Sequence, residues 1–464
     1  DAYFNNVREG VVIAHHVWSN LIYRDPNTGD YKGELATSWK WIDPKTLELE
    51  LRPGVKFHNG DGFSADDVVY TLSFVAKPEN GVITQQNVKW IESAEKLSDM
   101  KVRIHLKAPF PAALEYLAGP VVIYPGAYYQ KVGPKGMNEH PVGSGPYKVV
   151  DYTPGKVVKM ERNKDYFKDS PIAQPTIEKL EFRLIPDLNT QMAELLSGGI
   201  DWIWRVPPDQ AKQLAGMPNL TVTAGETMRV GYLWFDSTDQ TPTAALKDAR
   251  VRRALNMAVD REAIVRNLVG EGAHVIDAAC FPLQFGCTSD GVTHYPYDPA
   301  KAKALLAEAG YPNGFETDLS AYRDRPLAEA VIGYFRAIGV KANLRFMQYA
   351  AIRDLYREHK MAIQYTTWGS FSINDASAIT SAFFHFDADD LSRDPQVRDW
   401  LAVADNSVDP AVRKENYKKA LVRISEQAYW LPISSWPLTY AYSKDLEFTP
   451  HTDEIPRFWE ARWK

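Results

Sequence analysis

The segment 31–74 holds, in one short stretch, the patterns of a strand, a turn and a capped helix. Apolar and charged side chains alternate through residues 47–52, as in a strand that buries one face. Residues 59–62, Asn-Gly-Asp-Gly, tolerate the positive φ angles of a tight turn. Ser64 follows at the position of an N-cap, and two aspartates occupy the first turn, where the helix dipole favours negative charge. The segment therefore predicts a half-buried strand, a turn and a helix, in that order.

The composition is that of a globular protein large enough for two or three domains. The 464 residues are 45% hydrophobic and 24% charged, which is ordinary for folded domains. The net charge of −6 argues against a nucleic-acid partner, which would need a basic face. No apolar run reaches the roughly 18 residues of a membrane-spanning helix. The chain opens without the basic and apolar regions of a signal peptide, so we expect any such peptide to have been removed.

The two cysteines, Cys280 and Cys287, are seven residues apart, and turn-forming residues lie between them. Such a loop can bring two thiols within bonding reach, and we expect a disulfide. Two buried free thiols are one alternative. A metal site is another, although only His274 and Asp277 stand nearby as further ligands. A disulfide would indicate a location outside the cytoplasm.

Signals for catalysis are weak. Residues 143–145, Gly-Ser-Gly, lack the G-x-S-x-G spacing of a nucleophile elbow and favour a tight turn. His15 and His16 are adjacent, so they cannot share a helical face as the histidines of an HExxH motif do, and we expect a surface or cleft role for them. The glycines also lack the lysine and the helix start of a phosphate-binding loop. We therefore predict no enzyme activity, no cofactor and no metal site.

Further segments carry equally definite helix signals. Asp298 precedes a helix with apolar residues on one face, and Gly310 ends that helix. Asp260 separates two consecutive helical patterns as the second N-cap. Several such segments together resemble the dipeptide, oligopeptide and nickel class of extracytoplasmic solute-binding proteins (family 5, cluster C), which serve ABC importers. The segments that carry the resemblance are 31–74, 141–147, 161–167, 248–270 and 298–315.

The resemblance implies an α/β protein with the two-lobed periplasmic binding protein type II fold, an additional third domain and two hinge strands. We expect the hinge strands at 230–235 and 432–442, which are apolar and aromatic. Relatives usually have an N-terminal strand before the position of Asp1, so an edge strand of the first lobe is expected to be missing. The implied domains are a first lobe of 1–33, 169–233 and 437–464, an additional domain of 34–168, and a second lobe of 234–436.

The resemblance also implies a function in uptake. We expect a periplasmic, monomeric receptor that closes on a small organic solute and delivers it to an ABC permease, with a lipid anchor left open. The first choice of ligand is a short peptide or a peptide-like conjugate such as an opine. An oligosaccharide or another neutral polar solute is the alternative ligand, and a metal chelate is the third. A peptidase or hydrolase built on this scaffold is the alternative from a different class of function.

The segment 364–382 is the first candidate for ligand contact. In peptide-binding relatives an aspartate three residues after a tryptophan binds the α-ammonium group of the ligand, but here Phe371 stands three residues after Trp368. Asp375 either replaces that anchor or caps the helix that follows. The candidate contacts in this segment are Trp368, Ser370, Phe371, Ser372, Asn374 and Asp375.

The pair Tyr322–Arg323 is the second candidate. Peptide-binding relatives carry an arginine near this position for the ligand carboxylate, to which a guanidinium donates a planar pair of hydrogen bonds. Arg325 is a rival for the role, and a surface ion pair is the alternative for either arginine. Trp436, beside the second hinge, and Trp368 are candidate stacking walls, with core packing as the alternative.

Overall fold

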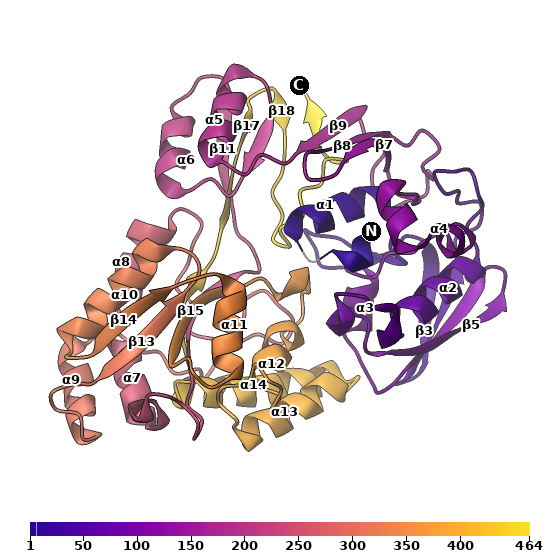
Figure 1. The fold of residues 1–464 in the computed structure, drawn as a ribbon. Helices are drawn as coiled ribbons and strands as arrows, with labels where there is room; N and C mark the ends of the chain where they lie inside the picture. The colour runs from indigo at the N-terminus through magenta and orange to yellow at the C-terminus, as the bar shows by residue number, and fades with distance from the viewer. Residues whose placement is uncertain (6) are drawn as a thin grey trace. The chain divides into compact units, whose positions relative to one another are not determined.

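The structure is a computed structural model that describes residues 1–5 and 7–464. The chain folds into two compact units (Figure 1). Unit 1 consists of residues 1–223 and 439–464, and unit 2 consists of residues 224–438. Both units combine sheets with helices, which confirms the predicted α/β class. Within the described residues no helix has the length and the apolar character that crossing a membrane requires.

The chain passes between the units at residues 223–224 and 438–439. These connections belong to β11 (Leu220–Gly225) and β17 (Leu438–Ser443), which are neighbours in one sheet. The second connection lies within the expected hinge at 432–442. The first precedes the expected hinge at 230–235, a stretch that instead forms β12 (Val230–Phe235) inside unit 2. The sequence misplaced it because a fully buried strand is as apolar as a hinge strand. The division of unit 1 into a first lobe and an additional domain stays a prediction.

Unit 1 is built mainly from antiparallel sheets with the orders β3-β4-β6-β5, β7-β8-β9 and β10-β17-β11, and from two-stranded ladders β1-β2 and β18-β19. Its other strands are β1 (Ile22–Arg24), β2 (Tyr31–Gly33), β3 (Ala36–Asp43), β4 (Thr46–Leu51), β5 (Ile91–Ser98), β6 (Lys101–Leu106), β7 (Tyr147–Thr153), β8 (Val157–Arg162), β9 (Lys179–Arg183), β10 (Trp202–Trp204), β18 (Leu446–Glu447) and β19 (Arg462–Trp463). Its α-helices are α1 (Arg8–Val17), α2 (Ala65–Val75), α3 (Ala113–Leu117), α4 (Gly126–Glu139), α5 (Leu188–Ser197) and α6 (Pro208–Ala215).

The segment 31–74 folds as its sequence predicts. In β4 the three leucines of the alternating pattern are buried while charged residues face outward. Ser64 caps α2 with a reciprocal pair of hydrogen bonds, because its hydroxyl accepts from Asp66 N–H while the Asp67 carboxylate accepts from Ser64 N–H. This strand, turn and helix were therefore predictable from the local sequence.

The glycines of the 141–147 segment are needed for close backbone packing against α1. A Cβ atom on Gly143 would lie 2.0 Å from the Val17 carbonyl oxygen, and one on Gly145 would lie 2.6 Å from that of His16. His58 joins the turn of the 31–74 segment to these glycines, since its backbone N–H donates to Gly143 O at 2.8 Å. Two segments that are far apart in sequence thus form one structural unit.

His16 is a core residue, contrary to the surface or cleft role expected of it. It is fully buried among aromatic rings, and its Nε2 accepts from the Phe458 N–H at 3.2 Å while Nδ1 bonds Val12 O at 2.8 Å. Burial lowers its pKa to about 3. The neutral ring therefore ties α1 to the C-terminal segment of unit 1.

Unit 2 contains a five-stranded sheet with the order β14-β13-β15-β12-β16. The strands besides β12 are β13 (Glu316–Ala321), β14 (Lys341–Phe346), β15 (Ile363–Trp368) and β16 (Trp430–Ser435). The α-helices are α7 (Ala249–Ala258), α8 (Arg261–Ile264), α9 (Pro299–Glu308), α10 (Arg325–Ala337), α11 (Tyr349–Arg357), α12 (Ser377–Phe383), α13 (Pro395–Asn406) and α14 (Pro410–Glu426). The predicted N-caps Asp260 and Asp298 accept backbone hydrogen bonds at the starts of α8 and α9, and Gly310 follows α9 with a positive φ of 93°.

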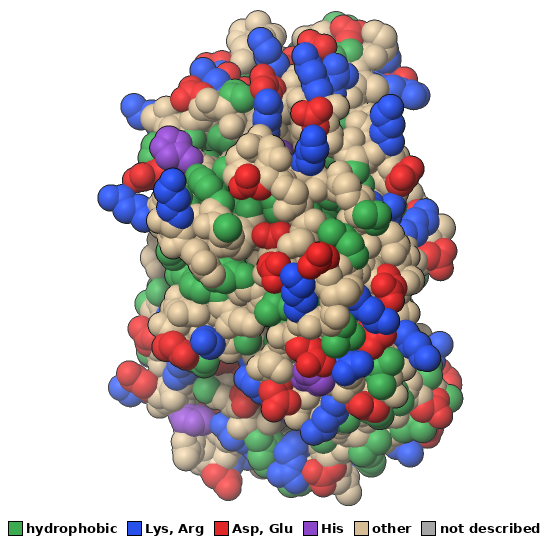
Figure 2. Space-filling view, turned by 90° about the vertical axis from the view of Figure 1, so that its right-hand side faces the viewer, with side chains coloured by type: hydrophobic (Ala, Val, Ile, Leu, Met, Phe, Trp, Pro, Cys, Tyr) green, Lys and Arg blue, Asp and Glu red, His purple; other side chains and the backbone are tan. Residues whose placement is uncertain are grey.

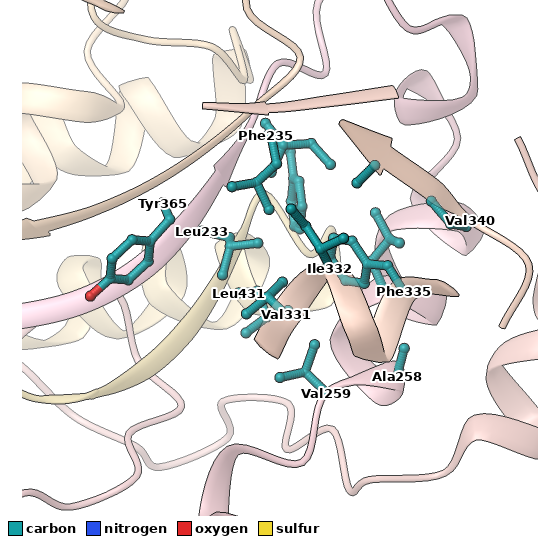
Figure 3. Close-up of a cluster of buried hydrophobic side chains, with 14 of the residues drawn as sticks. Leu233, Phe235, Ala258, Val259, Val331, Ile332, Phe335, Val340, Tyr365 and Leu431 are labelled. Atoms are coloured by element: carbon teal, nitrogen blue, oxygen red, sulfur yellow. The ribbon is translucent and has the colours of Figure 1, made fainter. Parts of the chain in front are cut away.

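Both faces of this sheet are buried, as a sheet with parallel strands requires. Leu233 and Phe235 of β12 lie in a cluster that includes side chains of α7, α9 and α10 (Figure 3). Tyr232 and Trp234 of the same strand lie in a second cluster with side chains of α11 to α14. The face in Figure 2 carries interspersed basic and acidic side chains.

Glu34 is a carboxylic acid enclosed in unit 1. Its side chain is 2% exposed, and Oε2 accepts from the Asn20 N–H at 3.2 Å. Burial raises its pKa to about 8, although the Ser19 hydroxyl, the Asn20 N–H and Arg52 oppose the rise.

The folded protein should therefore hold a proton on Glu34 between about pH 4.5 and 8 that the unfolded chain releases. Its free energy of unfolding then falls as pH rises through this window, by at most about 1.4 kcal/mol per pH unit. Glu34→Gln keeps the shape and removes the titration. We expect the stability gain of this variant over wild type to grow from pH 5 to pH 8 in urea unfolding. A difference in unfolding free energy between the two proteins that stays constant from pH 5 to pH 8 would contradict this prediction.

Candidate ligand-binding site

Five strand ends of unit 2 meet at one edge of its sheet. Strand β13 pairs in parallel with both β14 and β15, while β12 pairs antiparallel with β15 and β16. The carboxyl ends of β13, β14, β15 and β16 and the start of β12 therefore share this edge, which we call the carboxyl edge. In open α/β sheets this is the edge at which ligands bind.

Arg323 lies at the carboxyl edge, two residues after the end of β13. Its Nη1 donates to Thr367 Oγ1 at 2.8 Å, and its Nε donates to Asp324 Oδ2 at 2.5 Å. Burial alone would lower the pKa of the guanidinium, but Asp324 and the Tyr365 hydroxyl raise it above its ordinary value. The side chain is 31% exposed and its Nη2 makes no hydrogen bond within the described residues. Arg323 thus remains charged and keeps donors available.

The predicted tryptophans flank the start of β12. Val230 is paired with Trp368 on one side and with Ser435 on the other, so Trp436 follows at the same edge. The Arg323 guanidinium lies over the Trp436 ring, 5.4 Å from its centroid. A flat aromatic surface and a fixed positive charge are therefore adjacent.

Tyr322 completes this part of the edge. Its hydroxyl accepts from Thr366 Oγ1 at 3.4 Å, and its ring is 5.1 Å from that of Tyr349, which follows β14. The rival Arg325 is instead paired with Glu329 on the exposed side of α10, with more than half of its side chain accessible.

The loop of residues 369–376 follows β15 and has an unusual backbone. Ser370, Phe371 and Ser372 have positive φ angles of 51°, 51° and 65°. A left-handed conformation costs roughly 1–2 kcal/mol for a residue with a side chain, so the surroundings must impose it. Phe371 is 37% exposed, and its ring meets the edge of Trp368 at 4.8 Å. Ser370 is fully buried, and its hydroxyl has no partner among the described residues.

Asp375 is held by the protein itself. Its carboxylate forms an ion pair with Arg413 at 2.9 Å. Both residues are buried, with Asp375 3% exposed and Arg413 5% exposed. Oδ1 also accepts from the Ser377 N–H at the start of α12, as the capping interpretation expected. The backbone carbonyl oxygen of Asn374 accepts a hydrogen bond from the Phe285 N–H. The ion pair with Arg413 could not be foreseen, because α14 is distant in sequence.

Sequence reasoning also missed residues that the sheet register brings to this edge. Arg229 precedes β12, and its Nη1 donates to the same Thr367 hydroxyl as Arg323, at 3.2 Å. Tyr232 is buried with a hydroxyl that has no partner in the described part of the chain. Only strand pairing places these residues, so a single sequence gave no signal for them.

Cys280 and Cys287 form the predicted disulfide, with their Cα atoms 5.9 Å apart. This excludes the alternatives of free thiols and of a metal site at these cysteines. Asp277, the acidic ligand considered for that site, pairs with Arg261 at 2.8 Å. No group of three or more metal-ligating side chains is present in the residues that the structure describes.

Removing the Asp375 carboxylate should destabilise unit 2, because it leaves the Arg413 charge buried and unpaired. We expect Asp375→Asn to lower the free energy of unfolding by about 3–5 kcal/mol. The matched control is Asp399→Asn, whose partner Arg398 is exposed, and which should cost less than about 1 kcal/mol. Urea unfolding followed by tryptophan fluorescence measures both. Equal stabilities of the two variants would show that the Asp375 carboxylate is not structural.

Known proteins resemble this chain in both sequence and fold. The chain matches the family model of bacterial extracellular solute-binding proteins, family 5 Middle, over residues 30–390. It is 32% identical over 425 residues to the glutathione-binding protein GsiB of Pectobacterium atrosepticum. The aligned region covers 87% of this chain and 80% of that protein.

Two solved structures show the same architecture. A dipeptide-binding protein of Pseudoalteromonas sp. SM9913 in complex with Met-Leu has a TM-score of 0.83 and 25% identity over 100% of this chain and 97% of that one. AgaA of A. tumefaciens R10 in complex with agropinic acid has a TM-score of 0.78 and 26% identity over 97% and 94% of the two chains. The expected two-lobed type II fold is thereby confirmed. The chain belongs to the family 5 solute-binding proteins, which are receptors of ABC importers.

Proposed function

We propose that this receptor captures a peptide-like or opine-type molecule whose carboxylate binds Arg323, and that it delivers this molecule to an ABC permease from the periplasm. The observation that supports the proposal is the Arg323 guanidinium at the carboxyl edge, oriented by Thr367 and Asp324 and stacked beside Trp436. A guanidinium fixed in this way presents a planar fork that suits a carboxylate.

The residues around Arg323 favour an organic anion with a flat or apolar portion. Trp436 and Trp368 offer rigid surfaces for such a portion, and Tyr322 offers a hydroxyl. A neutral sugar would gain stacking from the same rings but would give the unbonded Nη2 of Arg323 no carboxylate to bind. The anionic ligand is therefore the better match.

The part of the site where peptide-binding relatives bind the α-ammonium group of a dipeptide is different in this chain. Phe371 occupies the position of the ammonium-binding aspartate of peptide-binding relatives, and Asp375 is committed to Arg413. A conjugate whose α-amine is substituted or displaced needs no carboxylate at that position. The names of GsiB and AgaA, glutathione-binding and agropinic-acid-bound, are consistent with such ligands. We propose that binding involves no chemical change of the ligand.

Replacing Arg323 should weaken binding of carboxylate ligands selectively. A charge-assisted hydrogen-bonded pair contributes about 1.5–3 kcal/mol, so we expect Arg323→Gln to lower affinity roughly 10- to 150-fold. Arg325→Gln is the matched control, because Arg325 is paired with Glu329 on the surface. Isothermal titration with S-methylglutathione, agropinic acid and Met-Leu measures the effect for each probe that wild type binds. Equal losses in the two variants would refute the assignment.

The natural ligand should carry at least one carboxylate. We expect mass spectrometry of the small molecules released on denaturing freshly purified protein to detect a species of dipeptide, tripeptide or opine size. Arg323→Gln protein purified in parallel should release less of it. Release of a neutral oligosaccharide in equal amounts from both proteins would overturn the proposal in favour of the alternative ligand class.

A further inference from the structure

The disulfide loop, residues 280–287, lies directly against the 369–376 loop. The Phe285 N–H donates to Asn374 O at 3.1 Å, and the Ala376 N–H donates to Phe285 O at 2.9 Å. These two bonds form a short parallel bridge between Phe285 and Asp375. The two loops are therefore joined through their backbones.

Gln284 adds a side-chain connection to this bridge. It is 3% exposed, and its Nε2 donates to Ile373 O at 2.8 Å, while Oε1 accepts from the Phe281 N–H at 3.1 Å. One end of the amide thus fixes the disulfide loop and the other end holds the 369–376 loop. A buried amide with both ends satisfied has one orientation, which makes it a rigid link.

The disulfide loop is itself anchored to α14. Gly286 has a φ of +82°, and a Cβ atom there would lie 2.3 Å from the Tyr417 ring. The Arg413 guanidinium lies over the Phe285 ring at 4.7 Å and is the same group that pairs with Asp375. The disulfide, α14 and the ion pair therefore converge on residues 373–376.

We propose that Gln284, held in place by the Cys280–Cys287 disulfide, is the positioning residue of the 369–376 loop and keeps Ser370, Phe371 and Ser372 in their left-handed conformation. Three successive side-chain-bearing residues do not adopt that conformation unaided, and the disulfide loop supplies hydrogen bonds just beyond them. The effect on ligand capture rests on the proposed function, because it assumes that the 369–376 loop contacts the ligand.

Hydrogen exchange of the ligand-free protein tests the positioning role without any ligand. Gln284→Ala keeps the disulfide, and Cys280→Ser with Cys287→Ser keeps the glutamine. We expect exchange in peptides covering 369–376 to be at least tenfold faster in both variants, with exchange in β12 unchanged. Gln284→Glu keeps the acceptor for Phe281 but loses the donor to Ile373, so it should behave like the alanine variant. Gln240→Ala, at an exposed position, is the control.

The result that overturns the positioning role is unchanged exchange in 369–376, or acceleration spread equally over β12 and the rest of unit 2. Titration of the probe that binds wild type best then tests the link to ligand capture. We expect Gln284→Ala to lower its affinity at least fivefold. If Gln284→Ala exchanges faster but binds the probe as tightly as wild type, only the link to ligand capture is overturned. A failure of the proposed function would appear separately, as equal affinities of Arg323→Gln and wild type for the probe.

Discussion

Parallel pairing of β13 with both β14 and β15 is the constraint on which the candidate site depends. Parallel strands need helical connections, so helices cover both faces of the sheet and leave its strand ends as the place for a ligand. Strand β12 runs antiparallel to its neighbours β15 and β16, so Arg229 and Trp436 reach the edge that already holds Arg323 and Trp368. Residues from four separate parts of the chain thus meet without any local sequence motif that unites them.

The fold was predictable where the information is local. Ser64, Asp260 and Asp298 cap helices because short polar side chains reach their own backbone a few residues on, which one sequence displays directly. The candidate site was predictable only in part, because Tyr322, Arg323 and Trp368 were reached through the resemblance to peptide-binding relatives and not from a local pattern. The Asp375–Arg413 pair was not, because the partner lies on a distant helix and ion pairing has no periodicity to reveal it.

The same reasoning explains the misplaced hinge and the misjudged histidine. Residues 230–235 read as a hinge strand because burial by helices on both faces and burial at a connection produce the same apolar pattern. His16 read as a surface residue because nothing nearby in sequence announces that Phe458 supplies a hydrogen bond to it. Both errors arise where tertiary contacts, not local propensity, set the environment.

The left-handed run at residues 370–372 bears on why this chain carries a benzyl side chain at Phe371. Glycine would adopt that backbone geometry with far less steric conflict, and a chain assembled only for ease of folding would have glycine there. The chain instead has a phenylalanine there, 37% exposed, at a position where a side chain makes the backbone harder to form. A side chain that makes the backbone of this loop harder to form and also stays partly exposed fits a contact to a ligand better than a part of the core.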